Sequence, residues 1–539
     1  MRRYSFIFIT MAVVMVMAFN TAQAKKTVAS NNMPAVTMAN DDDSNKSALD
    51  KYRERAAKGD AEAMLLLGKA YYHGLEGLDV DYKKAAKWFL DAAEVKDEAA
   101  AKWSAEAKGW LGLLYYSGKG VDPDKDRAMK LFLIATKGGF SELVTTFEDM
   151  AKEGDIFACK FMGECYNKGY GVKRNTDTAA KYTRMAADAG DKESYMSTAL
   201  YLYNNDKKGE SFKYFEKAAL EGDIKACYFY GMMLYDGNEM VEQDKVKGMK
   251  YLQMAADEGH VAANFKLGEL YLYGNGVTRD KEKGAKMIKV AAENGNNKAM
   301  WILGNCYRLG EGIKQDYALA AHWMSLVASG SRWSDYDKLI SELKERNDPF
   351  FIYLKGLQEY HINGNYDNAM NQFKALEKAK IAEGKTMQGV VLTNKNYKKK
   401  DLKKAAKIFE KASKESPLAC YYLSFMKENG DAGKQDPKAA LELLTKAAEG
   451  GCAQAQCRLG DKYIKGSGVG MDIEKAAKYY LLAEAQHALT PESAKQLAKL
   501  YENELSGMPV VEDLAKHVED LKKTKENNSL VKMLANTKF

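Results

Sequence analysis

Hydrophobic positions recur along most of the chain with the spacing of short amphipathic helices. In the clearest unit, residues 261–296, Ala263, Leu267, Gly268 and Tyr271 stand at positions i, i+4, i+5 and i+8. This spacing places an apolar stripe with a small gap on one face of a helix. A glycine loop follows, and then a second stretch with apolar residues at helical spacing and a closing pair of alanines. Residues 261–296 are therefore predicted to form two short helices joined by a glycine loop.

The same unit is repeated along the chain. The glycine in the gap, which we call the notch glycine, recurs as Gly68, Gly112, Gly163, Gly231, Gly268, Gly304, Gly356 and Gly460. Loops of the form Gly-x-Gly-Val or Gly-x-Gly-Ile begin at Gly118, Gly169, Gly274, Gly310 and Gly466. Three successive notch glycines are 37 and 36 residues apart, and a fixed period of this size is typical of a solenoid. We predict an all-α fold, an α/α superhelical solenoid of repeated helix-turn-helix units.

These motifs resemble those of a known family. The pattern A-x3-L-G-x2-Y-x2-G-x-G-V, followed by paired alanines, is similar to the Sel-one-like repeat, a relative of the tetratricopeptide repeat with a longer loop. Roughly nine or ten units cover most of residues 51–486. The resemblance implies a solenoid that acts as a scaffold or adaptor for other proteins. Two stretches depart from the pattern: residues 192–223 lack the glycine loop, and residues 385–415 read like a plain tetratricopeptide unit.

The repeats divide into two expected blocks, 51–331 and 350–486, with a degenerate linker or hinge at 332–349. The first block contains two long spacings. The 44 residues from Gly68 to Gly112 predict a second helix extended through 94–103, and the 51 residues from Gly112 to Gly163 leave room for an extra helix at 141–153. Residues 487–539 are predicted to form closing helices at 490–505 and 511–525, which cover the last apolar face, followed by a frayed tail.

The first 24 residues predict export. Two arginines precede an apolar run from Phe6 to Phe19, and Ala22 and Ala24 supply a small-x-small cleavage site before Lys25. An uncleaved membrane anchor is the alternative, but the apolar run is short for a membrane span. Residues 25–50 are polar and read as a flexible linker. The chain is therefore expected to be periplasmic or extracellular, without stable membrane insertion after cleavage.

Composition and charge add no sign of catalysis. The net charge of +7 comes partly from a lysine-rich run at 395–404, which reads as a solvated helix start rather than a nucleic-acid site. No two of the six histidines lie three or four residues apart, and each glycine loop follows a helix rather than a strand. We predict no enzyme activity, no metal and no other cofactor. Five of the seven cysteines (Cys159, Cys165, Cys227, Cys306 and Cys420) recur at two repeat positions, as packing residues do, although a Cys420–Cys457 disulfide stays open.

Aromatic residues outside the repeat pattern are the candidates for partner contact, with packing against the next repeat as the favoured alternative. They are Trp110, Tyr116, Tyr228, Phe229, Tyr273 and Trp301. Our hypothesis is an exported non-catalytic scaffold that binds a protein segment on its concave surface. The alternative is a cell-envelope polysaccharide-binding or regulatory module. An exposed row of aromatics would favour the glycan, and a groove of mixed charged and apolar character would favour the protein.

Overall fold

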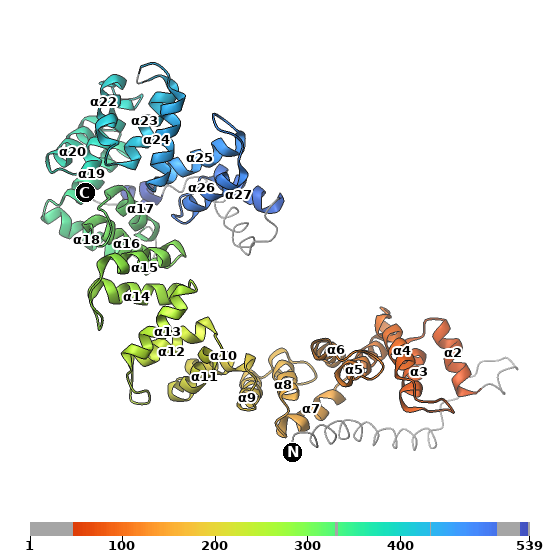
Figure 1. Cartoon of the computed structure of the whole chain (residues 1–539). Helices are drawn as coiled ribbons and strands as arrows, with labels where there is room; N and C mark the ends of the chain where they lie inside the picture. Colours follow the sequence, from red (N-terminus) through yellow and green to blue (C-terminus); the bar gives the residue numbers. More distant parts are fainter. Residues whose placement is uncertain (1–46, 329–332, 432, 504–528, 537–539) are drawn as a thin grey trace. The chain divides into compact units, whose positions relative to one another are not determined.

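The computed structural model describes residues 47–328, 333–431, 433–503 and 529–536, which belong to two compact units, Met1–Gln243 (unit 1) and Asp244–Phe539 (unit 2) (Figure 1). Within these ranges the regular elements are helices, apart from an isolated β-bridge between Asn238 and Val241. The prediction of an all-α fold is therefore confirmed. None of the described helices has both the length and the apolar character that a membrane span requires.

Unit 1 is a succession of short helices, each packed mainly against the next along the chain. They are α2 (Ala48–Ala57), α3 (Ala61–His73), α4 (Tyr82–Glu94), the 3-10 turn η1 (Glu98–Ala100), α5 (Ala101–Ser117), α6 (Lys125–Lys137), α7 (Glu142–Lys152), α8 (Ile156–Lys168), α9 (Thr176–Asp188), α10 (Glu193–Asn204), α11 (Lys208–Leu220) and α12 (Ile224–Asp236). Helix α7 is the extra helix predicted at 141–153. The predicted signal peptide lies outside the described residues, and so does the predicted linker up to residue 46.

Two boundaries in unit 1 differ from the predictions. Helix α2 begins at Ala48, so the last residues of the predicted linker 25–50 are helical. The stretch 94–103 does not extend a second helix, because α4 ends at Glu94 and Val95 is extended. Asp97 then caps the 3-10 turn by accepting a hydrogen bond from Ala99 N, and the residues that follow lengthen α5 instead.

The helices of unit 2 follow the same order of pairs. They are α13 (Lys245–Asp257), α14 (Val261–Tyr273), α15 (Lys281–Glu293), α16 (Asn297–Leu309), α17 (Tyr317–Ala328), α18 (Trp333–Glu345), α19 (Pro349–His361), α20 (Tyr366–Lys378), α21 (Ala382–Thr393), α22 (Leu402–Ala412), α23 (Pro417–Asn429), α24 (Pro437–Glu449), α25 (Ala453–Lys465), α26 (Ile473–Glu484), α27 (Pro491–Asn503) and α29 (Ser529–Asn536). Figure 1 shows them from yellow-green to blue.

The predicted hinge at 332–349 is mostly the helix α18. Its Tyr336, Ile340 and Leu343 are buried at i, i+4 and i+7, which is the pattern of a packed helix face. The loss of the repeat motif therefore did not mean a loss of structure. The division between the two compact units falls after Gln243 instead.

Notch glycines allow the two helices of a pair to approach closely. A Cβ atom at Gly268 would lie 2.7 Å from Cγ1 of Ile288, and one at Gly304 would lie 2.7 Å from Cγ of Met324. Because only glycine lacks this atom, the residue type is set by the contact. Gly389, which we did not identify from the sequence, has the same role, since a Cβ there would lie 2.6 Å from Phe409.

An aspartate or asparagine marks the start of most second helices. Its side-chain oxygen accepts a hydrogen bond from the backbone N–H three residues later, as N-cap residues do. The residues are Asp81, Asp124, Asn175, Asp244, Asp280, Asp316, Asn365, Asp401, Asp436 and Asp472. Asp124 follows Gly112 by the same interval as Asp280 follows Gly268, so the sequence held this signal and we overlooked it.

The end of the chain is partly as predicted. Helix α27 covers α25 and α26 and buries Ala494 and Leu497, which suits a closing helix. The second predicted closing helix, 511–525, lies outside the described residues. The tail that we expected to fray contains α29, which packs against α17 and α19 and buries Met533 and Leu534. This part of the prediction was wrong, because two adjacent apolar residues find a place in the core of unit 2.

Candidate functional site

Helix α17 is the centre of unit 2. From Tyr317 to Ala328 it contains no Asp, Glu, Lys or Arg. Its buried residues lie on several sides of the helix and include Trp323, which is 1% exposed. A helix that is apolar all round has to be covered by other elements. In unit 2, α16, α18, α19 and α29 all pack against it.

Hydrogen bonds join the α17 region to parts of unit 2 far along the chain. Tyr317 N donates to Oε1 of Glu383 in α21 over 2.6 Å, and Nε2 of His322 forms a 2.6 Å hydrogen bond with the carbonyl oxygen of Gln486. In the loop before α17, Nζ of Lys314 donates to a backbone carbonyl 101 residues later in the sequence, over 3.0 Å. Unit 2 is thus closed around α17.

A cavity of about 280 Å³ lies beside α17, and its walls come from several repeats. We call this surface the inner groove and define it by Leu319 of α17, Tyr353 and Leu357 of α19, Met387 of α21, and Leu418 and Tyr422 of α23. The turn at 450–454, the loop at 486–488 and Leu530 of α29 also line the cavity, and its polar lining includes Asp316, His322 and His361. Because α19, α21 and α23 are the first helices of successive pairs, the groove follows the stacking of the repeats.

Burial disfavours the charged forms of several ionisable groups in or beside the inner groove. Burial, together with repulsion from the Asp316 carboxylate, raises the pKa of Glu383 from 4.5 to about 7. Burial lowers the pKa of His322 and raises that of Tyr353 well above its usual range. Burial also raises the pKa of Asp316 and lowers that of His361, so the wall as a whole favours an apolar or neutral polar ligand over a charged one.

Two of the aromatic candidates lie in α5 of unit 1. Trp110 is 6% exposed, with ring centroids 5.2 Å from Tyr72 and 5.8 Å from Phe89. Tyr116 packs at 4.8 Å on Phe157, and burial raises its pKa to about 12. Both side chains are therefore committed largely to packing between repeats.

The other four candidates are distributed over three helices. Tyr228 and Phe229 lie side by side in α12 and are half-buried, and Phe229 stacks at 4.9 Å on Phe215. Trp301 of α16 is half-buried against the core of unit 2, whereas Tyr273 of α14 is 52% exposed. Among the described residues, the exposed large hydrophobic side chains include one aromatic, Tyr273.

The residues of the inner groove were missed by the sequence analysis. None of the six aromatic candidates lines it. A usable signal was the run of uncharged residues from Tyr317 to Ala328, because the other second helices of the repeats carry charges on their outer faces. The contacts that close the groove leave no local pattern, since their partners lie in distant repeats.

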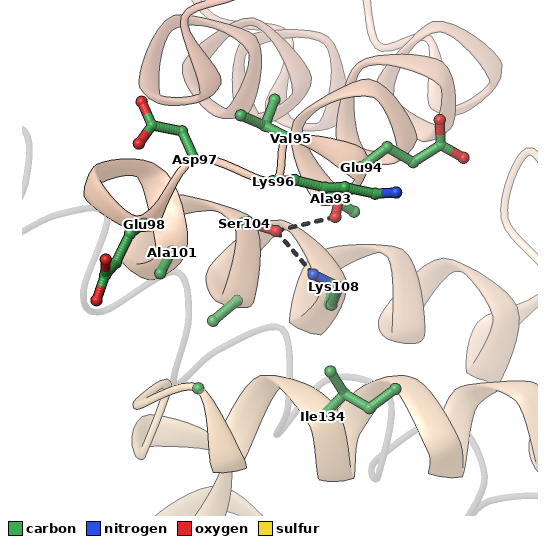
Figure 2. Close-up of a pocket in the computed structure, with 12 residues that line it drawn as sticks. Ala93, Glu94, Val95, Lys96, Asp97, Glu98, Ala101, Ser104, Lys108 and Ile134 are labelled. Carbon is green, nitrogen blue, oxygen red and sulfur yellow. Dashed lines mark hydrogen bonds between the residues drawn. The ribbon is translucent and has the colours of Figure 1, made fainter.

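A larger and more open hollow of about 790 Å³ lies in unit 1 at the turn between α4 and α5 (Figure 2). Two of its polar side chains are joined by hydrogen bonds: Ser104 Oγ donates to Ala93 O over 2.9 Å, and Lys108 Nζ donates to Ser104 Oγ over 2.7 Å. Burial lowers the pKa of Lys108. Most of the wall of this hollow belongs to the turn that the 3-10 insertion creates, and α6 and the residue after it add Ile134 and Gly138. We therefore attribute the hollow to that insertion.

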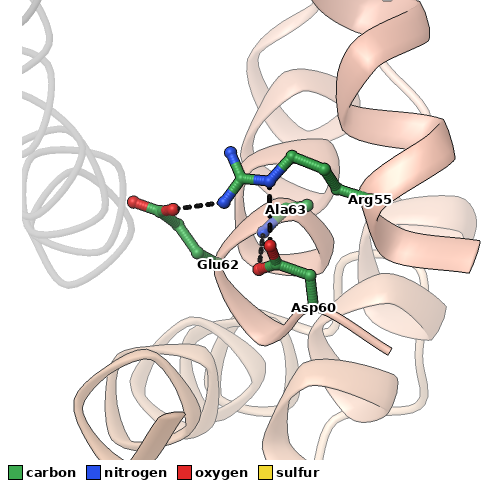
Figure 3. A network of polar contacts seen from close by, with 4 residues as sticks. All are labelled: Arg55, Asp60, Glu62 and Ala63. Carbon is green, nitrogen blue, oxygen red and sulfur yellow. Dashed lines mark hydrogen bonds and ion pairs between the residues drawn. The ribbon is translucent and has the colours of Figure 1, made fainter. Parts of the chain in front are cut away.

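A polar network at the start of unit 1 is also structural. Arg55 of α2 donates through Nε to Asp60 over 2.8 Å and through Nη2 to Glu62 over 2.6 Å (Figure 3). Asp60 also accepts from Ala63 N over 3.1 Å, which caps α3. Although burial opposes ionisation, these contacts hold the pKa of Asp60 below its usual range. The network therefore fixes α2 against α3.

The cysteines and acidic groups form no evident reactive site. All seven cysteines are free and buried, so the Cys420–Cys457 disulfide is not formed. Burial raises the pKa of the Cys165 thiol to about 12, which disfavours the reactive thiolate. Within the described ranges, no group of three or more His, Cys, Asp or Glu side chains is placed to hold a metal ion.

Comparison with known families identifies the repeat. The model of the Sel1 repeat matches ten segments, at 61–97, 105–140, 156–191, 201–223, 224–260, 261–296, 297–330, 396–416, 417–452 and 453–487. The chain belongs to the Sel1 repeat family. The resemblance seen in the sequence is thereby confirmed. The structure adds the pair α19 and α20 between the matched segments, where a Cβ at Gly356 would lie 2.5 Å from Phe373.

Curated relatives share only parts of their length with this chain. An uncharacterized Sel1-like repeat-containing protein of Schizosaccharomyces pombe is 26% identical over 251 residues, which cover 42% of this chain and 33% of that protein. The ERAD-associated E3 ubiquitin-protein ligase component HRD3B of Arabidopsis thaliana is 33% identical over 121 residues, 22% of this chain and 15% of that protein. The matched region thus spans a third or less of either relative.

Similar solved structures are also helical repeat proteins. The protective antigen c5321 of uropathogenic Escherichia coli, which has an SLR fold, is 22% identical, covers 91% of this chain and 93% of its own, and gives a TM-score of 0.32. A Sel1 repeat protein from Oxalobacter formigenes is 25% identical, covers 49% of this chain and 96% of its own, and gives a TM-score of 0.29.

Proposed function

We propose that this chain is a non-catalytic scaffold that binds a protein partner in the inner groove of unit 2. The observation that carries the proposal is the cavity of about 280 Å³, whose wall combines side chains from α17, α19, α21 and α23. Sel1 repeat proteins bind proteins, and a groove shared by several repeats offers a protein segment several contacts at once. HRD3B is a component of a ligase assembly, which supports a role among other proteins.

The chemistry of the groove favours a protein over a glycan. Leu357, Met387 and Leu418 provide apolar contact, and burial disfavours the charged forms of the neighbouring Tyr353 and Glu383. A glycan site needs exposed aromatic platforms beside polar groups, and Tyr273 lies outside the groove lining. The polysaccharide-binding alternative therefore has less support.

The titratable groups beside the groove have structural roles that support a non-catalytic function. Glu383 accepts the hydrogen bond from Tyr317 N at the start of α17, where a helix dipole favours a carboxylate. His322 holds the loop at Gln486. Using either group as a general base would break a contact that closes unit 2.

A groove variant and a matched surface variant test the protein-binding proposal. Leu418→Glu places a charge in the groove wall, whereas Leu481→Glu places one on a leucine of α26 that is already 39% exposed. Each chain is used to capture proteins from an envelope extract, and circular dichroism checks that each is folded. We expect wild type and Leu481→Glu to capture the same partner, which is recovered with unchanged mass. Leu418→Glu should not capture it. A partner that Leu418→Glu still captures, or that returns chemically altered, would contradict the proposal.

Export through residues 1–24 is part of the same proposal. It is supported by the arginines, the apolar run and the alanine cleavage site of that segment. N-terminal sequencing of the protein from its native cells should find Lys25 at or near the start. An intact Met1 would contradict export by cleavage.

A further inference from the structure

The last described helix of the chain lies against the inner groove. Helix α29 packs on α17 and α19, and its Met533 and Leu534 are 0% exposed within the hydrophobic cluster that also contains Tyr353 and Leu357. Leu530 lines the cavity itself. Unit 2 therefore already holds a helical segment of polypeptide at the surface proposed for a partner.

We infer that the inner groove recognises an amphipathic helix, and that α29 occupies the groove as a resident ligand of this kind. The inference rests on the proposed function, and it specifies the chemical form of the partner. The partner segment presents apolar residues at i, i+3 and i+4, as Leu530, Met533 and Leu534 do, because these positions share one helix face. It competes with α29 for the same site.

A hydrogen bond to the end of α29 adds a second element of recognition. Gln358 of α19 donates through Nε2 to the carbonyl oxygen of Leu534 over 2.8 Å. Because α29 ends at Asn536, this carbonyl lies in the last turn, where backbone oxygens have no partner within the helix. Gln358 therefore recognises a helix terminus, a feature that does not depend on the side chains of the ligand.

Helix α29 leaves part of the groove unfilled. Leu530 is the described α29 side chain that reaches the cavity, and about 280 Å³ remains beside it. A larger apolar side chain at this position would fill space that leucine leaves and would gain dispersion contacts. A partner helix with phenylalanine at the Leu530 position is thus expected to bind more tightly than α29 does.

The test uses a fluorescein-labelled synthetic peptide with the sequence of residues 526–539 and the full chain carrying Met533→Glu and Leu534→Glu. The two substitutions remove the resident helix from the groove without shortening the chain. We expect saturable binding of the peptide to this variant. Wild type should bind it at least about tenfold more weakly, because the tethered α29 competes at a high effective concentration.

Matched peptides and a groove variant make the test specific. The peptide with Met533→Glu and Leu534→Glu should not bind, and the peptide with Leu530→Phe should bind more tightly than the native sequence. Gln358→Ala, added to the vacated chain, should weaken native-peptide binding by about three- to tenfold, the range of one lost hydrogen bond. If the vacated double variant loses helix content by circular dichroism, Leu530→Glu replaces it, because Leu530 is only half-buried.

The outcomes separate this inference from the proposed function. The inference is wrong if a folded, vacated chain does not bind the peptide, or if wild type and the vacated chain bind it equally. A partner captured through Leu418 would leave the scaffold proposal standing in that case. Peptide binding without any captured partner would support helix recognition and count against the scaffold.

Discussion

Units 1 and 2 are built from the same repeat, and both have ion pairs between neighbouring repeats, such as Lys281 with Glu311 in unit 2, but their longer-range contacts differ. In unit 1, ion pairs join neighbouring repeats: Lys69 pairs with Glu106, 37 residues away, and Lys160 pairs with Glu193, 33 residues away. Unit 2 adds hydrogen bonds between residues 101, 164 and 176 positions apart. The repeat therefore fixes how one pair stacks on the next, while other residues decide whether the stack folds back on itself.

The second helices account for much of this difference. In unit 1, α9 carries Asp177, Lys181 and Arg184, which keep one side of the helix in water. Helix α17 has no charged residue from Tyr317 to Ala328 and so has no side suited to solvent. The later helices of unit 2 and α29 cover it, and the inner groove is the space that this wrapping leaves.

Replacing one buried tryptophan in each unit should show the largest contrast. Trp323→Ala removes a side chain at the centre of unit 2, at a cost of about 3–5 kcal/mol in the free energy of unfolding. Its ring lies 6.0 Å from that of His487, so hydrogen exchange should also rise in the loop at 486–488. Trp110→Ala should raise exchange only in α3, α4 and α5. Equally local effects in both units would contradict a closed unit 2.

The shared local rule is tested by two glycine variants. Gly268→Val forces a branched side chain against Ile288 and should cost about 1–3 kcal/mol. Gly276→Ala adds a methyl group at a loop residue with φ of 73°, at a cost of roughly 1 kcal/mol. Denaturant melts measure both. An unchanged melt for Gly268→Val would mean that the notch does not hold the helices together.

The free energy of unfolding of unit 2 should depend on pH through Glu383. Since the pKa of Glu383 is raised from 4.5 to about 7 by folding, the folded state favours the neutral acid. The stability contribution is complete below about pH 4.5 and is lost as the pH rises through about 7, by at most ~3 kcal/mol. Glu383→Gln keeps an acceptor for Tyr317 N and should flatten this dependence in melts of unit 2. Parallel pH profiles of stability for wild type and Glu383→Gln would refute a contribution from Glu383.

The smallest effect is expected at the start of unit 1. Asp60→Asn keeps the cap of α3 but loses the ion pair with Arg55, which is worth about 1 kcal/mol or less at a partly exposed site. Asp60→Ala loses the cap as well and should cost about 1 kcal/mol more. Denaturant melts should rank wild type above Asn and Asn above Ala. The reverse order of the two variants would show that the cap contributes little.

The sequence predicted what depends on local spacing. The notch at Gly268, the glycine loops and α7 all follow from residues within one or two repeats. The covering of α17 and the docking of Leu534 could not be predicted in this way, because their partners lie in other repeats and leave no periodic signal. The prediction of a degenerate linker at 332–349 missed helix α18 for a related reason. A missing motif was taken for missing structure, although Tyr336 and Ile340 had the spacing of a packed helix.

The candidate site was predicted less well than the fold. Aromatic residues outside the repeat pattern were chosen as contact residues, but such residues also fill irregular spaces between repeats. Trp110 does so between Tyr72 and Phe89. The groove residues Leu357 and Leu418 look like ordinary core positions in the sequence. Only the three-dimensional arrangement places them around a cavity.

Hydrogen exchange of the backbone amides in α29 tests the central claim, a groove in unit 2 that holds a helix, most directly. In wild type we expect the amides of α29 to be protected together with those of α17 and α19 that they contact. Met533→Glu with Leu534→Glu should abolish that protection while leaving unit 1 unchanged. Unprotected α29 amides in wild type, exchanging as fast as in the double variant, would contradict the account.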